Sequence, residues 1–195
     1  NAMASGESQW ITGPEARRDV QLFRAESDLI VVGIGSVLSD DCRLSVRASE
    51  LPLPEDDRSR AMIKPPHKMV LDSKGRISPQ ARVLYGGETI IITTVPAFLP
   101  EDIKVVEVPA NPHGRVDLSA WAHYLGETQY NDIFVEAGSV LSGSLIRGGW
   151  VDRLILYQAP RFLGHSARPI SDFCIDALRQ SPNFKVDEVK LMGGD

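Results

Sequence analysis

The length, composition and charge of this chain restrict what kind of protein it can be. Its 195 residues, 43% hydrophobic and 24% charged, are typical of a globular domain with a substantial core. The formal net charge of -5 argues against a nucleic-acid partner, and no apolar run is long enough to span a membrane. Cys42 and Cys174 form no CxxC motif and have no histidine at metal-ligand spacing, so we expect a reduced, cytoplasmic protein without a bound metal.

The predicted elements alternate between helices and strands. Thr12–Glu15 is a capping box with proline at the first helical position, so a helix should begin there. The continuous apolar run Leu29–Gly33 is typical of a fully buried strand. Further strands are expected at Met69–Asp72, Thr89–Thr94, Lys104–Val108, Asp132–Glu136, Leu154–Gln158 and Phe184–Leu191. Further helices are expected at Asp117–Leu125, Val140–Arg147 and, with weaker periodicity, Ile170–Gln180.

This order predicts an α/β fold of three layers, with a mostly parallel central sheet between helices. Only the weakly periodic helix separates the last two predicted strands, so an antiparallel edge is expected there. We interpret residues 1–195 as a single domain. Ligands of such sheets bind at the carboxyl ends of the strands, so the residues just after the strands are the candidates for a site.

The stretch Ile133–Leu145 is the most informative of these strand ends. A short apolar run ends in a single carboxylate, Glu136, and a turn of glycine and serine then leads into a helix. Unpaired backbone N–H groups at a helix start suit a phosphate, and glycine lets a ligand approach the backbone. The pattern predicts an acid beside an anion site, which is typical of an enzyme that uses a nucleotide cofactor.

A second candidate, Gly33–Asp41, follows the first buried strand and ends in two carboxylates. Its glycines would admit a cofactor, Ser36 could donate to a phosphate or amide, and Asp40 could orient or protonate a substrate. A plain connection in which Asp40 or Asp41 caps a turn explains the residues equally well. The stretch is not a GxGxxG pattern, so it does not indicate a Rossmann fingerprint.

Basic side chains supply the remaining candidates. Ser73, Lys74 and Arg76 follow a predicted strand and could bind the 2′-phosphate that distinguishes NADPH from NADH. A solvated basic turn explains these three residues as well. Three arginines have guanidinium groups that suit phosphate but are also compatible with an ordinary surface: Arg24, Arg43 and Arg47.

Taken together, these stretches resemble the reductase domain of the bifunctional riboflavin-biosynthesis deaminase/reductases, the RibD family. Gly35–Arg47 resembles the family's G-T-V-L-A-D-D-P-x-L-T-V-R motif, with Cys42 in place of proline. Ala137–Ser139 stands where G-G-P is commoner. The other matching segments follow in the family's order: Ser5–Thr12, Ala16–Gln21, Val70–Ser73, Val135–Gly138, Val151–Asp152, Ala159–Pro160 and Leu163–Gly164.

The resemblance implies a dihydrofolate-reductase-like fold. It also implies the NADPH-dependent reduction of 5-amino-6-(5-phosphoribosylamino)uracil to the ribitylamino product, by a homodimer or higher homo-oligomer. The positions that it assigns to NADPH are Trp10, Ser36, Asp40, Ser73, Gly138, Ser139, Val140, Leu141, Ser142, Gly143 and Ser144. The positions that it assigns to the substrate are Ser8, Arg24, Leu44, Arg47 and Glu136.

Such a reaction opens the ribose ring and delivers hydride to C1′, so a nearby carboxyl group should handle the proton. Asp40 and Glu136 are both candidates for this role. The family's first strand is expected before residue 1, and no zinc-deaminase signature occurs, so the chain corresponds to the reductase half. Two alternatives stay open: a reductase of another pterin- or flavin-like substrate, and a non-catalytic module that binds a nucleotide or mediates assembly.

Overall fold

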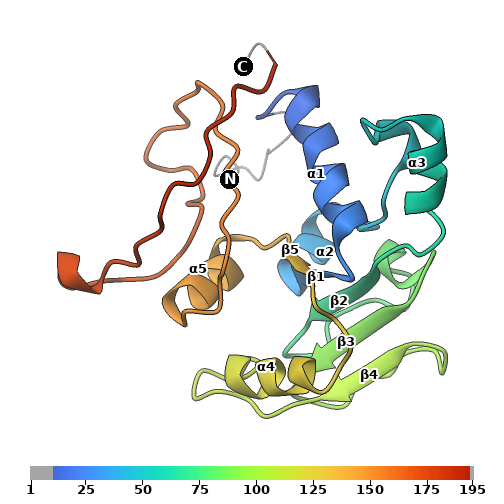
Figure 1. Ribbon diagram of the computed structural model, residues 1–195. Helices are drawn as coiled ribbons and strands as arrows, with labels where there is room; N and C mark the ends of the chain where they lie inside the picture. The colour runs from blue at the N-terminus through green and yellow to red at the C-terminus, as the bar shows by residue number, and fades with distance from the viewer. Residues whose placement is uncertain (1–10, 194–195) are drawn as a thin grey trace. The chain divides into compact units, whose positions relative to one another are not determined.

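The computed structural model describes residues 11–193, which divide into two compact units. Residues 21–137 form the larger unit, and residues 11–20 with 138–193 form the smaller one. Helix α1 (Pro14–Glu26) runs from the smaller unit into the larger one (Figure 1). It begins with a proline, whose missing N–H group costs nothing at the first helical position, as the sequence predicts.

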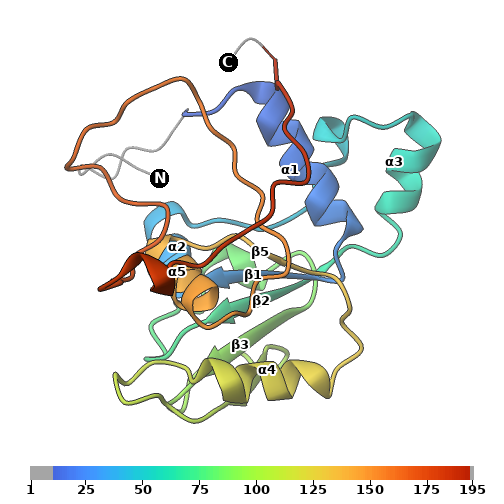
Figure 2. The same ribbon diagram turned by 60° about the vertical axis from the view of Figure 1, so that its left-hand side comes forward.

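The larger unit is built on a parallel five-stranded sheet (Figures 1 and 2). Its strands are β1 (Leu29–Gly33), β2 (His67–Leu71), β3 (Thr89–Thr93), β4 (Lys104–Glu107) and β5 (Ile133–Val135). They lie in the order β4-β3-β2-β1-β5, and every neighbouring pair is parallel. The three central strands, β1 to β3, are buried on both faces over most of their length, which explains why most of their residues are apolar.

Helices cover both faces of this sheet. One face packs Ile30 and Val70 against Val37 of α2 (Ile34–Asp40). Alternate strand residues point the other way. On that side the sulfur of Met69 accepts a hydrogen bond of 3.1 Å from the indole of Trp121 in α4 (Leu118–Gly126). Figure 2 shows α2 and α4 on opposite sides of the strands, so the predicted three-layer α/β architecture is confirmed.

Four further helical segments of the described chain lie outside the sheet. They are the helix α3 (Glu55–Ala61) and the 3₁₀ turns η1 (Ala48–Glu50), η2 (Arg82–Leu84) and η3 (Leu178–Gln180). The first three lie in the two connections that lead from β1 to β2 and from β2 to β3.

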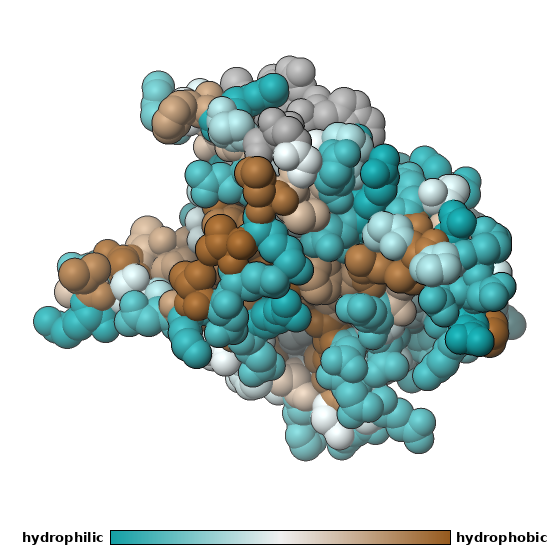
Figure 3. Space-filling model, turned by 45° about the horizontal axis from the view of Figure 1, so that its top comes forward, coloured by the Kyte–Doolittle hydropathy of each residue, from teal (hydrophilic) through white to brown (hydrophobic). Residues whose placement is uncertain are grey.

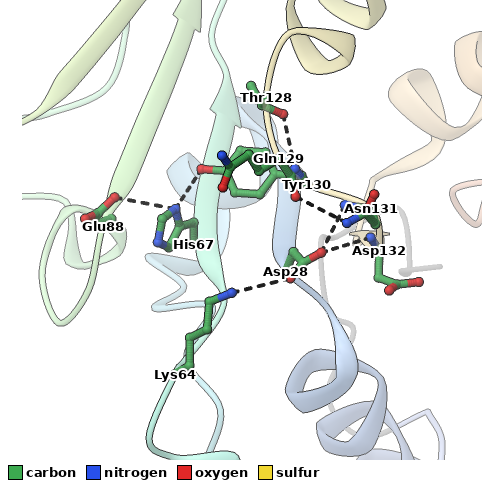
Figure 4. Close-up of polar contacts among 9 residues, drawn as sticks. All are labelled: Asp28, Lys64, His67, Glu88, Thr128, Gln129, Tyr130, Asn131 and Asp132. Atoms are coloured by element: carbon green, nitrogen blue, oxygen red, sulfur yellow. Dashed lines mark hydrogen bonds and ion pairs between the residues drawn. The ribbon is translucent and has the colours of Figure 1, made fainter.

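A polar network joins the chain at the amino ends of β1, β2 and β5 (Figure 4). The carboxylate of Asp28 accepts hydrogen bonds from the backbone N–H groups of Asn131 and Asp132, at 2.9 and 3.3 Å. These bonds lower the pKa of Asp28. Nδ1 of His67 lies 2.6 Å from the hydroxyl of Tyr130, whose pKa is raised by burial. The network therefore fixes the loop before β5 to the starts of β1 and β2.

In the smaller unit, a glycine lets a connecting segment cross α5 (Ser139–Arg147) at close range. A Cβ atom on Gly143 would lie 2.5 Å from the carbonyl oxygen of Asp172. The N–H group of Asp172 donates to the carbonyl of Ser139 at 2.9 Å, and the hydroxyl of Ser142 donates to the carbonyl of Ile170 at 3.1 Å. Residues 170–172 are thereby bonded to α5.

Those contacts explain why the predicted helix at Ile170–Gln180 is wrong: the backbone at its start bonds to α5, and only η3 is helical. The predicted strands Leu154–Gln158 and Phe184–Leu191 are also wrong, because neither has regular secondary structure. Residues 11–193 therefore contain no antiparallel edge. A strand needs a neighbouring backbone ladder, which an apolar pattern alone does not provide.

The absence of a ladder leaves apolar side chains of the smaller unit in contact with solvent. Figure 3 shows hydrophobic side chains at the molecular surface. Between residues 154 and 191 the exposed large hydrophobic side chains are Leu154, Leu156, Phe162, Ile170, Ile175, Leu178, Phe184, Val186, Val189 and Leu191.

Candidate active site

One polar face of α1 connects the end of β5 to the loop that follows α2. Nε and Nη2 of Arg24 donate to the two carboxylate oxygens of Glu136, at 2.5 and 2.8 Å. Nη1 of the same guanidinium donates to the carbonyl of Ser45 at 3.1 Å. One turn earlier, the buried side chain of Gln21 accepts a hydrogen bond of 2.9 Å from the N–H group of Arg47. The i, i+3 spacing puts both α1 side chains on one face of the helix.

The Arg24–Glu136 pair is largely shielded from water, with side-chain exposures of 13% and 25%. Burial opposes the charge on Arg24, but the hydrogen bond and negative charge of Glu136 outweigh it, so the pKa of Arg24 is raised. Two parallel hydrogen bonds between a guanidinium and a carboxylate also fix the geometry. Glu136 therefore holds Arg24 in one orientation.

The loop of residues 41–47 is held in an unusual conformation. Asp41 and Leu44 have φ values of 41° and 53°, in the left-handed region that L-residues rarely adopt. The carboxylate of Asp41 accepts a hydrogen bond from the N–H group of Arg82 at 2.9 Å, and the side chains of Leu44 and Val46 are buried. These contacts and the hydrogen bonds from α1 compensate the strain in the backbone of the loop. Strained backbone of this kind is common in ligand-binding loops.

The charges around this loop affect the pKa of the Cys42 thiol. Burial raises the pKa of its thiol, and the negative charges of Glu136 and Asp40 raise it further. Both carboxylates that the sequence singles out therefore act on the same partly buried side chain. Of the three charged residues around this loop, Glu136 and Arg24 are bonded to each other, whereas Asp40 is exposed at the end of α2.

The carboxyl end of β2 carries a basic turn. The hydroxyl of Ser73 accepts a hydrogen bond from the N–H group of Val116 at 2.9 Å, which anchors the turn to the segment before α4. Buried Asp72 accepts from the N–H group of Ile77 at 2.8 Å through one oxygen, and its other oxygen has no hydrogen-bond partner within the described chain. Exposed Lys74 follows, so the turn offers a hydroxyl and a cation where ligands of parallel sheets bind.

The predicted substrate residues fall in different places. Arg24 and Glu136 form the shielded pair, and Arg47 is exposed and bonded to Glu50 at 2.7 Å. The side chain of Leu44 lies in the core, so a ligand can reach only its backbone. Two predicted residues lie outside the described part of the chain: Ser8 and Trp10.

The predicted cofactor turn forms the start of α5 in the smaller unit, where Gly138 is the N-cap. The first N–H groups of a helix have no partner within it, so the segment Gly138–Leu141 can bind an anion through its backbone. Further along, the hydroxyls of Ser142 and Ser144 donate to carbonyls within the helix, and Gly143 serves packing against Asp172. Ser36, also predicted to bind the cofactor, lies in the first turn of α2.

Two residues of the site were missed from the sequence. Gln21 and Ser45 fix the loop 41–47, the latter through its backbone carbonyl. The signal that could have found Gln21 was its spacing from Arg24 on a polar helix face. Ser45 takes part through its backbone carbonyl, and a backbone acceptor gives no signal in the sequence.

Residues 11–193 hold no group of three histidine, cysteine, aspartate or glutamate side chains arranged for a metal. No helix in this described range has the length and apolarity to cross a membrane.

Comparison with known proteins decides the family. The model of the RibD C-terminal domain matches residues 1–195. The chain belongs to this family. It is 41% identical over 203 residues to the riboflavin biosynthesis protein RibD of Escherichia coli (strain K12), covering all of the chain and 54% of that protein. The chain thus spans about half the length of its RibD relatives.

Two other members of the family are informative. The 5-amino-6-(5-phosphoribosylamino)uracil reductase of Buchnera aphidicola subsp. Acyrthosiphon pisum is 33% identical over 205 residues, with 99% of this chain and 95% of that protein covered. Among solved structures, Acinetobacter baumannii RibD superposes with a TM-score of 0.77 at 32% identity, covering 99% of this chain and 51% of that one. The match to the RibD structure agrees with the parallel α/β fold described above.

Proposed function

We propose that this chain is an NADPH-dependent reductase that converts 5-amino-6-(5-phosphoribosylamino)uracil into its ribitylamino product. The observation that carries the proposal is the Arg24–Glu136 pair bonded to the fixed loop 41–47, in a chain of the RibD family. The Buchnera relative supports it further, because the similarity covers 95% of a protein with this name. A nicotinamide cofactor is consistent with a reductase of this family.

The arginines give the acidic chain a place for the substrate's phosphate. Arg47 is exposed, and its contact with Glu50 is a surface ion pair that a doubly charged phosphate can replace. Arg24 is already paired with Glu136, so it contributes directed N–H groups rather than a free charge. The backbone of the loop at Leu44 would contact the rest of the substrate.

The two carboxylates take different roles in this proposal. Glu136 accepts two hydrogen bonds from Arg24 and serves to position it. Asp40 is exposed at the end of α2, and its side chain makes no hydrogen bond or ion pair in the described part of the chain, so we assign it the proton. As the ribose ring opens, its oxygen takes that proton and C1′ takes a hydride. When bound, NADPH supplies the hydride.

The residues that would hold NADPH fit its chemistry. In the larger unit, the basic turn after β2 has Ser73, Lys74 and Arg76, whose groups suit the 2′-phosphate. In the smaller unit, considered by itself, the backbone at the start of α5, Gly138–Leu141, suits a pyrophosphate. Ser36 would donate a hydrogen bond from α2. These groups would bind and orient NADPH, and the proton transfer is assigned to Asp40.

The test is NADPH consumption by the purified protein with the phosphoribosylaminouracil substrate, together with NADPH binding measured by fluorescence. We expect Arg47→Ala to lower kcat/KM by roughly 10- to 100-fold, as for a lost charge-assisted phosphate contact, with NADPH binding retained. The matched control is Arg60→Ala, on the exposed face of α3. An unchanged rate in Arg47→Ala would favour another pterin- or flavin-like substrate. Failure of the wild type to bind NADPH would favour the non-catalytic module.

We further propose that the chain forms a homodimer or higher homo-oligomer. The apolar side chains exposed between residues 154 and 191 support this, because a second copy would remove them from water. Light scattering at several concentrations tests it, and a single mass equal to one chain would contradict it. The cytoplasmic location stays a prediction.

A further inference from the structure

A buried carboxylate lies at the base of the basic turn that follows β2. Asp72 is the first residue after this strand, and none of its surface is exposed. Its Oδ2 atom accepts a hydrogen bond of 2.8 Å from the N–H group of Ile77, whereas Oδ1 has no hydrogen-bond partner in the described part of the chain. Because a buried charge without a partner is costly, a cation is expected close to Oδ1.

The cation that compensates Asp72 is Arg76. Its Nε atom lies 3.9 Å from Oδ1, which is within ion-pair distance but too long for a hydrogen bond. Among residues 11–193, no other basic side chain forms an ion pair with Asp72. The side chain of Arg76 is 52% exposed, and its Nη1 and Nη2 atoms make no hydrogen bond within the same residues. The contact through Nε therefore leaves both Nη atoms available to the oxygens of a ligand.

The backbone of the turn is fixed independently of Arg76. The carbonyl of Asp72 accepts a hydrogen bond of 3.2 Å from the N–H group of Gly75, whose φ value of 58° allows the chain to turn there. The hydroxyl of Thr94, which directly follows β3, donates to the carbonyl of Ser73 at 2.7 Å. The part of the turn that can still reorient is the long side chain of Arg76, and its ion pair with Asp72 restricts that motion.

We infer that Asp72 is a positioning residue for the 2′-phosphate of NADPH, and that it acts through Arg76. The ion pair turns Nε toward the end of β2 and leaves the two Nη atoms to form a pair of hydrogen bonds with the phosphate. A side chain that is already oriented loses less conformational entropy when its ligand binds. Because the turn is taken as the 2′-phosphate site, this role rests on the proposed function.

The role makes Asp72 a determinant of cofactor specificity. NADPH and NADH differ only in the 2′-phosphate, so a residue that orients a phosphate ligand affects the binding of one cofactor and not the other. A residue that only stabilises the fold affects both alike. The negative charge of Asp72 by itself repels a phosphate, but the charge is paired with Arg76, so we expect orientation to outweigh repulsion.

The experiment measures the dissociation constants of the full chain for NADPH and for NADH by fluorescence. We expect the wild type to prefer NADPH. Asp72→Asn keeps an oxygen acceptor for the N–H group of Ile77, and it should weaken NADPH binding by at least about ten-fold while leaving NADH binding unchanged. Arg76→Ala should have the same effect. Adding Asp72→Asn to Arg76→Ala should weaken NADPH binding no further, because the two residues act as one unit.

The matched control is Asp28→Asn, at the amino ends of the strands. Asp28 also accepts hydrogen bonds from backbone N–H groups and also lies 3.9 Å from a cation, Lys64. Its substitution should change neither dissociation constant. Circular dichroism establishes that each variant is folded before it is titrated.

The other possible results separate positioning from a structural role. Equal weakening of NADPH and NADH binding in Asp72→Asn would overturn the inference, and so would tighter NADPH binding, because the carboxylate would then only repel the phosphate. A further loss in the double variant would also overturn it. Arg76 is exposed, so Arg76→Ala remains a test if Asp72→Asn does not fold, and an unchanged NADPH preference in it would refute the role of Asp72.

The wild type distinguishes failure of this inference from failure of the proposed function. Equal binding of NADPH and NADH would overturn the 2′-phosphate site and the role of Asp72, but it would leave the reductase in place. Binding of neither cofactor would contradict the proposed function itself.

Discussion

Lys68 makes the stability of this chain depend on pH in alkaline solution. It lies on β2 with 2% of its surface exposed, and its Nζ atom donates to the carbonyls of Val83 and Tyr85. Burial lowers its pKa from an ordinary 10.5 to about 8. The folded protein therefore releases this proton near pH 8, whereas the unfolded chain keeps it to much higher pH.

The sign and size of the effect follow from proton linkage. Between the two pKa values the unfolded state binds more protons, so the free energy of unfolding rises with pH. The full gain across the window is about 3 kcal/mol, and about 2 kcal/mol of it falls between roughly pH 7 and pH 9.5. Stability is lost again as the pH falls through the folded-state pKa, because a buried charge must then be accommodated.

The test compares the wild type with Lys68→Met by urea unfolding at the two pH values. The loss of two hydrogen bonds in the variant affects both measurements alike, so only the pH-dependent difference reports on the charge. On going to the higher pH, we expect the free energy of unfolding to rise by about 2 kcal/mol more in the wild type than in the variant. Lys185→Met, which removes a lysine with 90% side-chain exposure, is the control and should follow the wild type. A wild-type gain equal to that of Lys68→Met would refute the argument.

Two further predictions concern contacts inside each unit. Glu136→Gln leaves the shielded charge of Arg24 without compensation, and we expect it to lower the free energy of unfolding by about 1–3 kcal/mol in urea titrations. Gly143→Ala forces a Cβ atom to within 2.5 Å of the carbonyl oxygen of Asp172, and we expect a loss of about 1–3 kcal/mol. Differential scanning calorimetry should then show a lower Tm for the glycine variant.

Control variants show whether these losses of stability come from the named contacts or from any substitution of the same kind. Glu50→Gln removes a carboxylate whose partner Arg47 is largely exposed, so it should change stability by less than about 0.5 kcal/mol. An equal loss in Glu136→Gln and Glu50→Gln would contradict the role of burial. Gly126→Ala adds a Cβ atom in open space at the end of α4, and a Tm shift equal to that of Gly143→Ala would contradict the packing argument.

The sequence predicted the five strands and α4 of the larger unit to within a few residues, but it did not predict the helices α2 and α3. The run Leu29–Gly33 had to become a buried strand, because a continuous apolar segment of that length is stable only between two covered faces. The prediction from the sequence was wrong in the smaller unit, where Leu154–Gln158 and Phe184–Leu191 have strand-like composition but form no strand. Strand formation depends on a partner backbone, which local composition does not encode.

The sequence by itself singled out the residues to which we assign the chemistry, namely an acid after β5, acids at the end of α2, and arginines on α1 and the loop 41–47. Only the tertiary structure shows which of these residues are in contact. Arg24 and Glu136 are 112 residues apart and meet because β5 pairs with β1 beneath α1. That contact is the reason why we propose a positioning role for Glu136 and assign the proton to Asp40, and the contact depends on strand order. Strand order is set by how the whole sheet buries its faces, so no local pattern in the chain could have supplied it.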